Sequence, residues 1–244
     1  YATILNVPDE YTTIQEAIDA AVDSDTVLVD QGTYYENLII QKNITLASNA
    51  IYDDLSEWVN FSVEWTLTEG AANIANTTIN GSLDTNGDDM QSVIYINSPE
   101  GECIEPLIFG FTITGGDGTL VTGEEGQELR GGGFYSNNAL PEIHYNYIYN
   151  NKGTVDPIQA GGGSDIDFNE RCEGDVDMSY NFYRDNDALY GNTLSTNGFI
   201  GSLNMSHSIF DVYNCPEEEV TPVWVDVEEE VEVNFEDGEG DVCS

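Results

Sequence analysis

One short turn carries the residues whose spacing best suits metal chemistry. In the stretch "DTNGDD", side chains with oxygen atoms stand at alternate positions, and two carboxylates follow one another. Oxygens placed in this way can converge on a hard cation such as Ca²⁺. An EF-hand loop would have glycine at its sixth position and a carboxylate at its twelfth, where this chain has Asp89 and Tyr95. Two interpretations stay open, a Ca²⁺ site and a plain turn, and the candidate ligands are Asp84, Asn86, Asp88 and Asp89.

Acid–base catalysis would need carboxylates or histidines in a defined order. The close acidic pairs are Asp53 with Asp54, Asp88 with Asp89, and Asp165 with Asp167. Because the chain has 46 acidic residues, such pairs are expected by chance, and none is assigned a catalytic role. The histidines, His144 and His207, align with neighbouring positions of the repeats described below. We interpret both as ladder or surface residues.

Basic residues could abstract a proton beside a uronate carboxyl, as polysaccharide lyases require. The candidates are Lys42, Arg130, Lys152, Arg171 and Arg184. Lys152 and Arg184 fall near the ends of successive repeats and could share a face. We interpret the five as single solvated cations on an acidic surface.

The net charge excludes several classes of partner. Forty-six acidic residues face five basic ones, for a formal net charge of −41. No basic patch can neutralise phosphates, so nucleic acid is excluded. Anionic membranes and anionic polysaccharides are disfavoured unless a divalent ion bridges the surfaces. Bound cations or a salty medium would relieve the self-repulsion. No apolar run is long enough to span a membrane, and the first residues, "YATILNVP", are expected to begin a mature, secreted product.

The cysteines and the glycosylation motifs suit an extracellular protein. No C-x-x-C pair occurs among the four cysteines, so two disulfides are favoured over a zinc site. Three pairings are open on paper; we favour Cys215–Cys243, which leaves Cys103–Cys172 by elimination. N-x-Ser/Thr motifs begin at Asn43, Asn60, Asn76, Asn80 and Asn204.

The elements that would position such groups begin with a single helix. Apolar residues in "EYTTIQEAIDAAVDSD" have helical spacing, with Thr12 or Thr13 as N-cap and Glu16 in the first turn. Short strands are predicted at "ILNVP", "TVLV", "NLII" and "NITLAS", with a turn at "DQGTYYE". A helix placed first can cover the open end of a sheet or solenoid.

Internal repeats determine the predicted fold. The segments "LIFGFTITGG", "IHYNYIYNNK", "MSYNFYRDND" and "MSHSIFDVYN" align without gaps. Their fourth position is small or polar, and it is occupied by Gly110, Asn146, Asn181 and Ser208. A second series contains "GGGFYS", "GGGSDI" and, more loosely, "GFIGSL". Two short strands per coil with small residues at the corners indicate a β-solenoid.

The chain resembles the right-handed parallel β-helix, or pectin-lyase-like, superfamily, and in particular secreted bacterial β-helix repeat proteins. The stretch "DTVLVDQGTYYENLIIQKNITL" matches the start of such proteins, and the "GFTITGG" and "GGGFY" coils match in style. The resemblance implies coils up to about Asn214, including residues 47–103, with strands near "FSVEWTL", "TTIN" and "SVIYIN".

The resemblance to the enzymes of this superfamily is partial. Pectin methylesterases share "GTYYEN", at Gly32 to Asn37, but the chain has no counterpart of their "QDT", "DFIFG" or "GRPW" segments. The "NTD…DD…GHG…RIK" order of polygalacturonases is also missing. The sequence therefore predicts a protein that is not an enzyme.

The C-terminal tail has a different pattern. In "TPVWVDVEEEVEVNFEDGEGDVCS", apolar and polar residues alternate, which indicates two half-buried strands. They are expected to dock on the solenoid or on a neighbouring molecule through Val223, Val225, Val227, Val231, Val233 and Phe235.

Taken together, the predicted fold is an all-β, right-handed parallel β-helix. Residues 1–24 would form an N-terminal strand and capping helix, 25–214 the coils, and 215–244 an acidic strand extension. The predicted function is that of a non-catalytic extracellular structural or adhesive protein, self-associating into a filament or surface array. The alternative is a secreted protein that binds or degrades polysaccharide. Ca²⁺ is the one expected cofactor.

Overall fold

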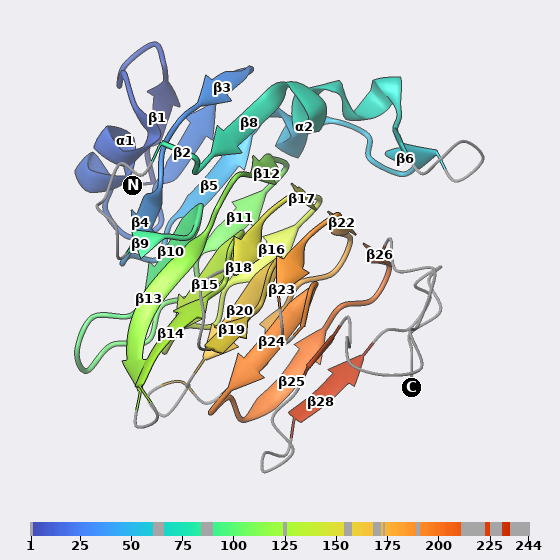
Figure 1. The fold of residues 1–244 in the computed structure, drawn as a ribbon. Coiled ribbons are helices and arrows are strands. Elements are labelled where there is room, and N and C mark those ends of the chain that lie inside the picture. Colours follow the sequence, from blue (N-terminus) through green and yellow to red (C-terminus); the bar gives the residue numbers. More distant parts are fainter. Residues whose placement is uncertain are drawn as a thin grey trace.

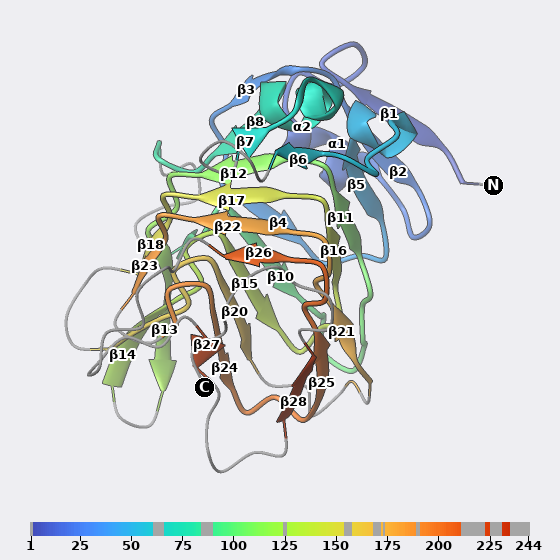
Figure 2. The ribbon, with the colours of Figure 1, turned by 90° about the vertical axis from the view of Figure 1, so that its right-hand side faces the viewer.

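The computed structural model describes residues 2–60, 66–83, 90–123, 126–153, 158–167, 172, 174–188, 191–210, 223–224 and 231–234. Over these ranges the chain forms the predicted parallel β-helix, in which successive coils stack from the N-terminus to the C-terminus (Figure 1). Three parallel sheets run along the stack. Figure 2 looks onto one of them, where β12, β17, β22 and β26 lie one below the other.

The first sheet contains eight strands: β1 (Ile4–Val7), β2 (Thr26–Val29), β5 (Thr45–Ser48), β11 (Leu107–Phe109), β16 (Glu142–His144), β21 (Val176–Asp177), β25 (Gly201–Asn204) and β28 (Val231–Asn234). The second contains β3 (Gly32–Tyr34), β8 (Thr77–Asn80), β12 (Thr112–Thr114), β17 (Tyr147–Tyr149), β22 (Phe182–Arg184) and β26 (Ile209–Phe210). The third contains β4 (Leu38–Ile40), β10 (Ile94–Asn97), β15 (Phe134–Asn137), β20 (Ser164–Asp167), β24 (Leu194–Asn197) and β27 (Val223–Trp224). The segment predicted as a turn at Gly32 is therefore a strand.

A fourth, smaller sheet lies beside the coils. It consists of β9 (Met90–Gln91), β13 (Gly118–Gly123), β14 (Gly126–Arg130) and β19 (Ile158–Ala160). Two short pairs complete the strands: β6 (Val59–Asn60) with β7 (Thr66–Leu67), and β18 (Lys152–Gly153) with β23 (Asp187–Ala188).

The core fills the inside of the coils. Along each strand, side chains alternate between the inside and the outside, so equivalent residues of successive coils stack in ladders. Val27, Leu46 and Ile108 form one such ladder across β2, β5 and β11, and all three are fully buried. Burial of these stacked aliphatic side chains supplies the main stabilisation of the fold.

Asparagine ladders hold the corners between the first and second sheets. The side-chain oxygen of Asn146 accepts a hydrogen bond from the backbone N–H of Phe111 at 3.0 Å, and that of Asn181 accepts one from Asn146 at 2.9 Å. Ser208 continues the series by accepting from the Asn181 N–H at 3.1 Å. The aligned small or polar positions of the repeats are therefore confirmed as stacked corner residues.

The N-terminal helix α1 (Ile14–Ala20) is confirmed, including its capping residues. Thr13 and Glu16 form a capping box. In addition, the Glu36 carboxylate accepts hydrogen bonds from the N–H groups of Ile14 and Gln15, both at 2.9 Å. A carboxylate at this end is favourable because the first N–H groups of a helix lack partners and carry partial positive charge.

The opposite end of α1 is held by Lys42. Its ammonium group donates to the carbonyl oxygens of Ile18, Asp19 and Ala21 at 2.8–2.9 Å. The Gln15 side chain also forms hydrogen bonds with both the backbone N–H and the carbonyl oxygen of Ile39. Ile39 lies on β4, the edge strand of the third sheet, and Gln15 covers this edge as a neighbouring strand would. The "GTYYENLIIQKN" stretch thus fastens the capping helix to the first coil.

Replacing Lys42 with Met is expected to lower the free energy of unfolding by about 2 kcal/mol, because three hydrogen bonds from a charged donor and a favourable helix-end charge are lost. Urea denaturation at fixed ionic strength measures this loss. Lys152→Met is the matched control, since Lys152 is exposed on β18. Equal effects of the two substitutions would contradict the capping role.

Residues 49–60 and 66–76 leave the coils instead of forming one, which corrects part of the predicted 47–103 range. They contain the 3₁₀ helices η1 (Asn49–Tyr52) and η2 (Glu69–Ala71), β6, β7 and the helix α2 (Ala72–Asn76). Leu55, Trp58 and Ile74 belong to a second apolar cluster, against which Phe109 and Tyr145 pack from the coils. The predicted strands at "TTIN" and "SVIYIN" are confirmed as β8 and β10.

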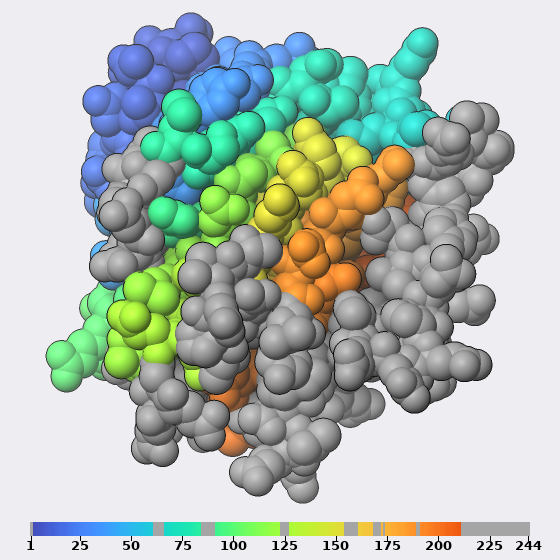
Figure 3. All heavy atoms as spheres, viewed as in Figure 1, coloured from blue at the N-terminus to red at the C-terminus, as the bar shows by residue number. Residues whose placement is uncertain are grey.

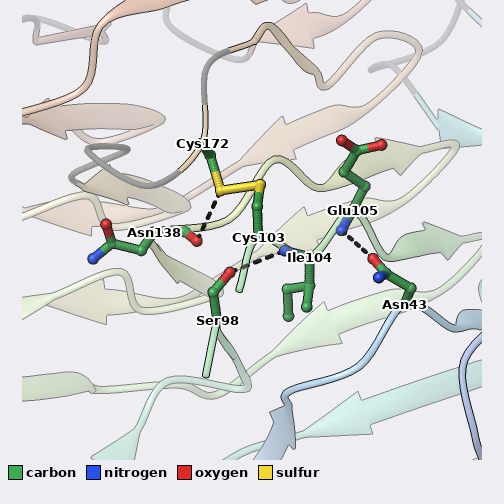
Figure 4. Close-up of a disulfide and its surroundings, with 7 residues drawn as sticks. All are labelled: Asn43, Ser98, Cys103, Ile104, Glu105, Asn138 and Cys172. Atoms are coloured by element: carbon green, nitrogen blue, oxygen red, sulfur yellow. Dashed lines mark hydrogen bonds between the residues drawn. A yellow bond between two sulfur atoms is a disulfide. The ribbon is translucent and has the colours of Figure 1, made fainter. Parts of the chain in front are cut away.

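The disulfide Cys103–Cys172 links the turns that precede β11 and β21 (Figure 4). Its Cα atoms lie 5.4 Å apart, and the two residues are separated by 69 positions in sequence. The turn of the intervening coil lies beside the bridge, since Cys172 Sγ is 3.1 Å from the carbonyl oxygen of Asn138. The bridge therefore links two coils across the turn of the intervening one. The predicted pair Cys215–Cys243 lies outside the described residues.

The two described pieces of the C-terminal tail continue the coils of the same chain. β27 pairs in parallel with β24, with Val223 opposite Leu194. β28 pairs in parallel with β25, with Val233 opposite Leu203. Of the other residues proposed for assembly, Val231 lies in β28, whereas Val225, Val227 and Phe235 lie outside the described residues. Self-association stays a prediction.

Candidate active site

Two buried carboxylates lie side by side on the outer face of the third sheet. In β20, Ser164 and Ile166 point into the core, so alternation places Asp165 and Asp167 outside. Their side chains are nevertheless hidden, with 0% of Asp165 and 2% of Asp167 exposed. Burying two carboxylates is costly unless protons, cations or hydrogen bonds compensate them.

Arg130 supplies a positive charge beside this pair. Its Nη1 atom lies 3.5 Å from Oδ2 of Asp165 and 3.8 Å from Oδ1 of Asp167. Its Nη2 atom donates to the carboxylate of Glu128 on the same strand. The cluster therefore combines one permanent cation with three acidic groups, and an excess of negative charge favours holding a proton among the carboxylates.

A glycine corner positions Arg130. The residue ends β14, and the three glycines that follow turn the chain into β15. Gly131 has a left-handed φ of 53°. A Cβ atom at Gly132 would stand only 2.6 Å from the carbonyl oxygen of Gly162 in the next coil. Glycine allows the two corners to stack this closely. The Arg130 side chain can then reach the strand of the following coil.

The pKa values of the two carboxyl groups are both displaced upward. Burial raises the pKa of Asp165, while the neighbouring Arg130 opposes that change. Burial and the charge of Asp165 together raise the pKa of Asp167 well above its usual range. The two carboxyl groups are close enough for each to affect the pKa of the other. They therefore titrate as a pair, and the pair keeps a proton above the usual pKa range of a carboxyl group.

Unsatisfied oxygen atoms support a shared proton. Within the described ranges, both oxygens of Asp165 and Oδ1 of Asp167 lack a hydrogen bond of standard geometry, although Ser195 and Arg130 lie close enough to Asp165 to lower its pKa. The other oxygen, Oδ2 of Asp167, lies 3.3 Å from the Tyr135 hydroxyl, which donates to it. Burial and the charge of Asp167 raise the pKa of Tyr135 well above its usual range, so Tyr135 keeps its proton. A proton held between the two carboxyl groups would satisfy one oxygen of each.

The pair makes stability depend on pH. A group whose folded-state pKa lies above its unfolded value stabilises the fold fully below the unfolded value, and this contribution is lost as pH rises through the folded value. Asp167 has its ordinary value at 3.8. From about pH 4 upward, the wild type is therefore expected to lose stability more steeply than Asp167→Asn, by up to about 1.4 kcal/mol per pH unit.

Urea denaturation in steps between pH 4 and pH 8, at constant ionic strength, measures this difference. The general repulsion among surface carboxylates acts in both proteins and cancels in the comparison. Asp9→Asn, at an exposed position, is the matched control for the change in net charge. Parallel curves for the wild type and Asp167→Asn would contradict a raised pKa at Asp167.

The other cations of the described residues do not form a lyase-like site. Lys42 binds the end of α1, as described above. Lys152 is exposed, and Nε of Arg184 lies 3.4 Å from Oδ2 of Asp185. The repeats left open that Lys152 and Arg184 share a face; they lie in β18 and β22, and only Lys152 belongs to the small β18–β23 pair. Arg171 lies outside the described residues, and Arg130 is the cation that the sequence interpretation wrongly placed in solvent.

Neither histidine contacts the carboxylate pair. His144 lies on β16 with Nδ1 3.2 Å from the carbonyl oxygen of Ser179. His207 stacks on Tyr180, with ring centroids 4.5 Å apart, and Tyr180 stacks on Tyr145. These contacts confirm the interpretation of the histidines as ladder or surface residues.

The predicted Ca²⁺ turn is not tested. Asp84, Asn86, Asp88 and Asp89 lie outside the described residues. Elsewhere, the part of the chain that the structure describes contains no group of three or more His, Cys, Asp or Glu residues arranged to hold a metal. In the same ranges, no helix combines the length and the apolar character needed to cross a bilayer.

The glycosylation motifs differ in accessibility. Asn60 and Asn76 are exposed, whereas Asn43, Asn80 and Asn204 are partly buried. The side-chain oxygen of Asn43 accepts a hydrogen bond from the Glu105 N–H at 2.6 Å (Figure 4). Glycosylation of these residues stays a prediction. The disulfide itself indicates an oxidising compartment.

The sequence contained a signal for the carboxylate pair that pairwise counting missed. Aligning the "GGGFYSN" and "GGGSDID" corners puts Asp165 in register with Tyr135 and Asp167 with Asn137, as the structure confirms. The residue before the first of these corners is Arg130. A charged residue beside a coil corner, followed one coil later by two outward carboxylates, distinguishes this pair from the other acidic pairs.

Comparison with known proteins gives a likeness in fold. No protein-family model matches the chain, and no curated protein matches it. A pectin methylesterase from Aspergillus niger is similar, with a TM-score of 0.42 and 15% identity over 97% of this chain and 75% of that one. A mutant pectin methylesterase in complex with a hexasaccharide has a TM-score of 0.36 and 12% identity, over 94% and 66% of the two chains.

Both of these proteins are enzymes, and this finding overturns the prediction that the chain is not an enzyme. The likeness concerns the parallel β-helix fold, which hosts unrelated activities. At this level of similarity, the chemistry of the chain has to be argued from its own residues.

Proposed function

We propose that the protein is a secreted hydrolase that cleaves esters on polysaccharides. The observation that carries the proposal is the buried pair Asp165 and Asp167, with Arg130 between its negative charges. Two carboxyl groups whose environments separate their pKa values are suited to act as base and acid in one reaction.

Each group has a distinct role in this proposal. Asp165, which lies closer to Arg130, is assigned the role of base and takes a proton from a water molecule as that water attacks the ester carbonyl carbon. Asp167 gives its proton to the departing alcohol oxygen, and Arg130 stabilises the negative charge that develops on the carbonyl oxygen. Ester and water are thereby converted to acid and alcohol. The proton then passes from Asp165 to Asp167 through their shared hydrogen bond, which restores the starting state.

The closeness of the two carboxyl groups favours an ester over a glycosidic bond. Glycoside hydrolases place their two carboxyl groups on either side of the bond, about 5 Å apart or more. Here both carboxyl groups lie on one strand and beside the same guanidinium nitrogen, Nη1 of Arg130, at 3.5 Å and 3.8 Å. A lyase reaction is also poorly served, because Arg130 faces three acidic groups that raise its pKa despite the opposing effect of burial. Such a cation does not act as a base.

The proposal requires that the pair become accessible. Asp165 and Asp167 are shielded from water in the substrate-free protein. Binding must therefore move side chains over the pair, as substrate-linked closure and opening do in many enzymes. The polysaccharide part of the proposal is supported by the surface next to the pair, described in the following subsection, and by analogy of fold with proteins that act on pectin.

The test is acid release from polysaccharide esters. The full-length protein, in a buffer of high ionic strength, is incubated with an O-acetylated neutral polysaccharide and with a methyl-esterified polyuronate, and the released acid is titrated at constant pH. Hydrolysis with a bell-shaped pH dependence is expected. The double variant Asp165→Asn/Asp167→Asn is expected to be folded and inactive. A folded wild type that cleaves neither ester would overturn the proposal.

A further inference from the structure

The surface beside the carboxylate pair carries a row of amides. Asn97, Asn137 and Asn197 occupy the same register position as Asp167 on β10, β15 and β24. We call these three residues the amide row. Neighbouring strands lie about 4.8 Å apart, so the row runs along the axis of the solenoid with a regular repeat. The row is partly exposed, and Asn137 donates to the side-chain oxygen of Asn97 at 3.1 Å.

An aromatic platform accompanies the row. Tyr95 and Tyr135 stand next to Asn97 and Asn137 on the same outer face, and their rings stack with centroids 5.1 Å apart and planes 6° from parallel. Tyr135 is buried against Asp167, whereas Tyr95, one coil further from the pair, is partly exposed. Amide groups beside a partly apolar ring provide hydrogen bonds and a flat contact, as sites for uncharged polar ligands do.

The charges near this face oppose an acidic ligand. Carboxylate-bearing chains are usually recognised by Arg or Lys. Within the described residues, Arg130 is the cation at the pair, and Glu128, Asp165 and Asp167 already surround it. The net charge of −41 adds a general repulsion of polyanions.

We infer that the amide row binds a neutral polysaccharide chain lying along the solenoid axis, so that the ester cleaved is an O-acyl group and not a uronate methyl ester. This inference rests on the proposed function and specifies its substrate. Hydrolysis of an O-acyl ester leaves an uncharged sugar and releases a small acid that can diffuse away. Hydrolysis of a uronate ester would instead leave a carboxylate fixed to the bound chain, beside Glu128 and Asp165.

Binding is tested with unesterified polymers, so that catalysis does not interfere. Titration calorimetry compares a neutral xylan or mannan with polygalacturonate, at low and at high salt. The neutral chain is expected to bind at least tenfold more tightly than the polyuronate. Asn97→Ala and Asn137→Ala are expected to weaken binding of the neutral chain about tenfold each, a typical loss for a direct hydrogen-bonding contact. Asn76→Ala, at an exposed position on α2, is the matched control.

A variant that is expected to bind polygalacturonate more tightly provides a second test of the inference. Asn97→Lys is expected to raise the affinity for polygalacturonate at low salt, whereas Asn76→Lys, with the same change in net charge, is not. Tighter binding of polygalacturonate than of the neutral chain by the wild type would overturn the inference, and so would equal effects at Asn97 and Asn76.

Failure of the inference can be distinguished from failure of the proposed function. If the wild type hydrolyses the methyl-esterified polyuronate faster than the O-acetylated neutral chain, the inferred substrate is wrong and the proposed esterase activity stands. If the neutral chain binds through the amide row but the Asp165→Asn/Asp167→Asn variant remains active, the inferred binding stands and the proposed catalytic pair is wrong. If neither polymer binds and neither ester is cleaved, both are overturned.

Discussion

Asp165→Asn is expected to lower kcat for ester hydrolysis about a thousandfold, because general base catalysis by a positioned side chain contributes between about 10²- and 10⁴-fold. An amide in place of the carboxylate preserves shape and burial but cannot take a proton from water. The same substitution removes a negative charge from a cluster with three acidic groups and one cation. The folded state is therefore expected to persist, which makes the kinetic effect interpretable.

Asp167→Asn is expected to change the pH profile as well as the rate. The wild-type profile should fall at low pH as the pair takes up a second proton and at high pH as it loses its last one, because the pKa values of both groups are raised. These limits belong to the pair and not to either residue alone. Removing the acid should abolish the high-pH limb and lower the maximal rate.

Initial rates of acid release between pH 3 and pH 9 measure both effects. Asp187→Asn is the matched control, since Asp187 is an exposed carboxylate on β23 outside the pair. A loss of rate in Asp187→Asn as large as that in Asp165→Asn would show that net charge, and not the pair, controls the reaction. An unchanged profile for Asp167→Asn would refute its role as the acid.

Loss of the Cys103–Cys172 disulfide is expected to lower the free energy of unfolding by about 4 kcal/mol, the chain-entropy value for a closed loop of this length. The loop spans 69 positions and the bridge connects turns on either side of an intervening coil. Without the bridge, the unfolded chain gains freedom that the folded chain does not. Many domains have a total stability of only about 5–15 kcal/mol, so a change of this size is severe.

Urea denaturation of Cys103→Ala, Cys172→Ala and the double variant measures the loss. If the cross-link is responsible, each single variant and the double variant should be destabilised equally, because one substitution already removes the bridge. Additive losses would instead assign the effect to packing of the individual side chains. A loss below about 1 kcal/mol in all three would contradict the cross-link as a major source of stability.

Local patterns were enough to predict much of the fold. The helix at Ile14–Ala20 follows from its apolar period and from capping by Thr13 and Glu16, which act within a few residues. The corner ladder of Asn146 and Asn181 was predictable because each coil repeats the same requirement. Both signals depend on residues that are near one another in sequence or in register.

The departure from the coils at residues 49–60 and 66–76 was not predictable in this way. Its apolar residues Leu55, Trp58 and Ile74 pack on the outside of the coils, where no repeat constrains them. The carboxylate pair was missed for a different reason. In a chain with 46 acidic residues the spacing of Asp165 and Asp167 is uninformative, and only the approach of Arg130 from the preceding coil distinguishes them.

Figure 3 shows how the described coils follow one another over the surface, from the N-terminal cap to residues near 210. The hydrogen bonds that Glu36 and Lys42 form with the two ends of α1 imply an order in which these coils form. All of these hydrogen bonds join residues no more than 24 positions apart. The cap and the first coil can therefore assemble once the first forty or so residues are free to fold, before any later coil is complete.

Short-range contacts of this kind form quickly, whereas pairing of distant strands is slow. Each later coil then meets an existing strand edge as its template and has to close only its own loop. We expect growth to propagate from this cap, because in a stack of repeats each coil contacts only its neighbours. At the growing end, the last coil then presents the unpaired strand edges of the three sheets. Propagation from the cap limits the time during which unpaired strands could join those of another chain, which is the main route by which proteins rich in parallel strands aggregate.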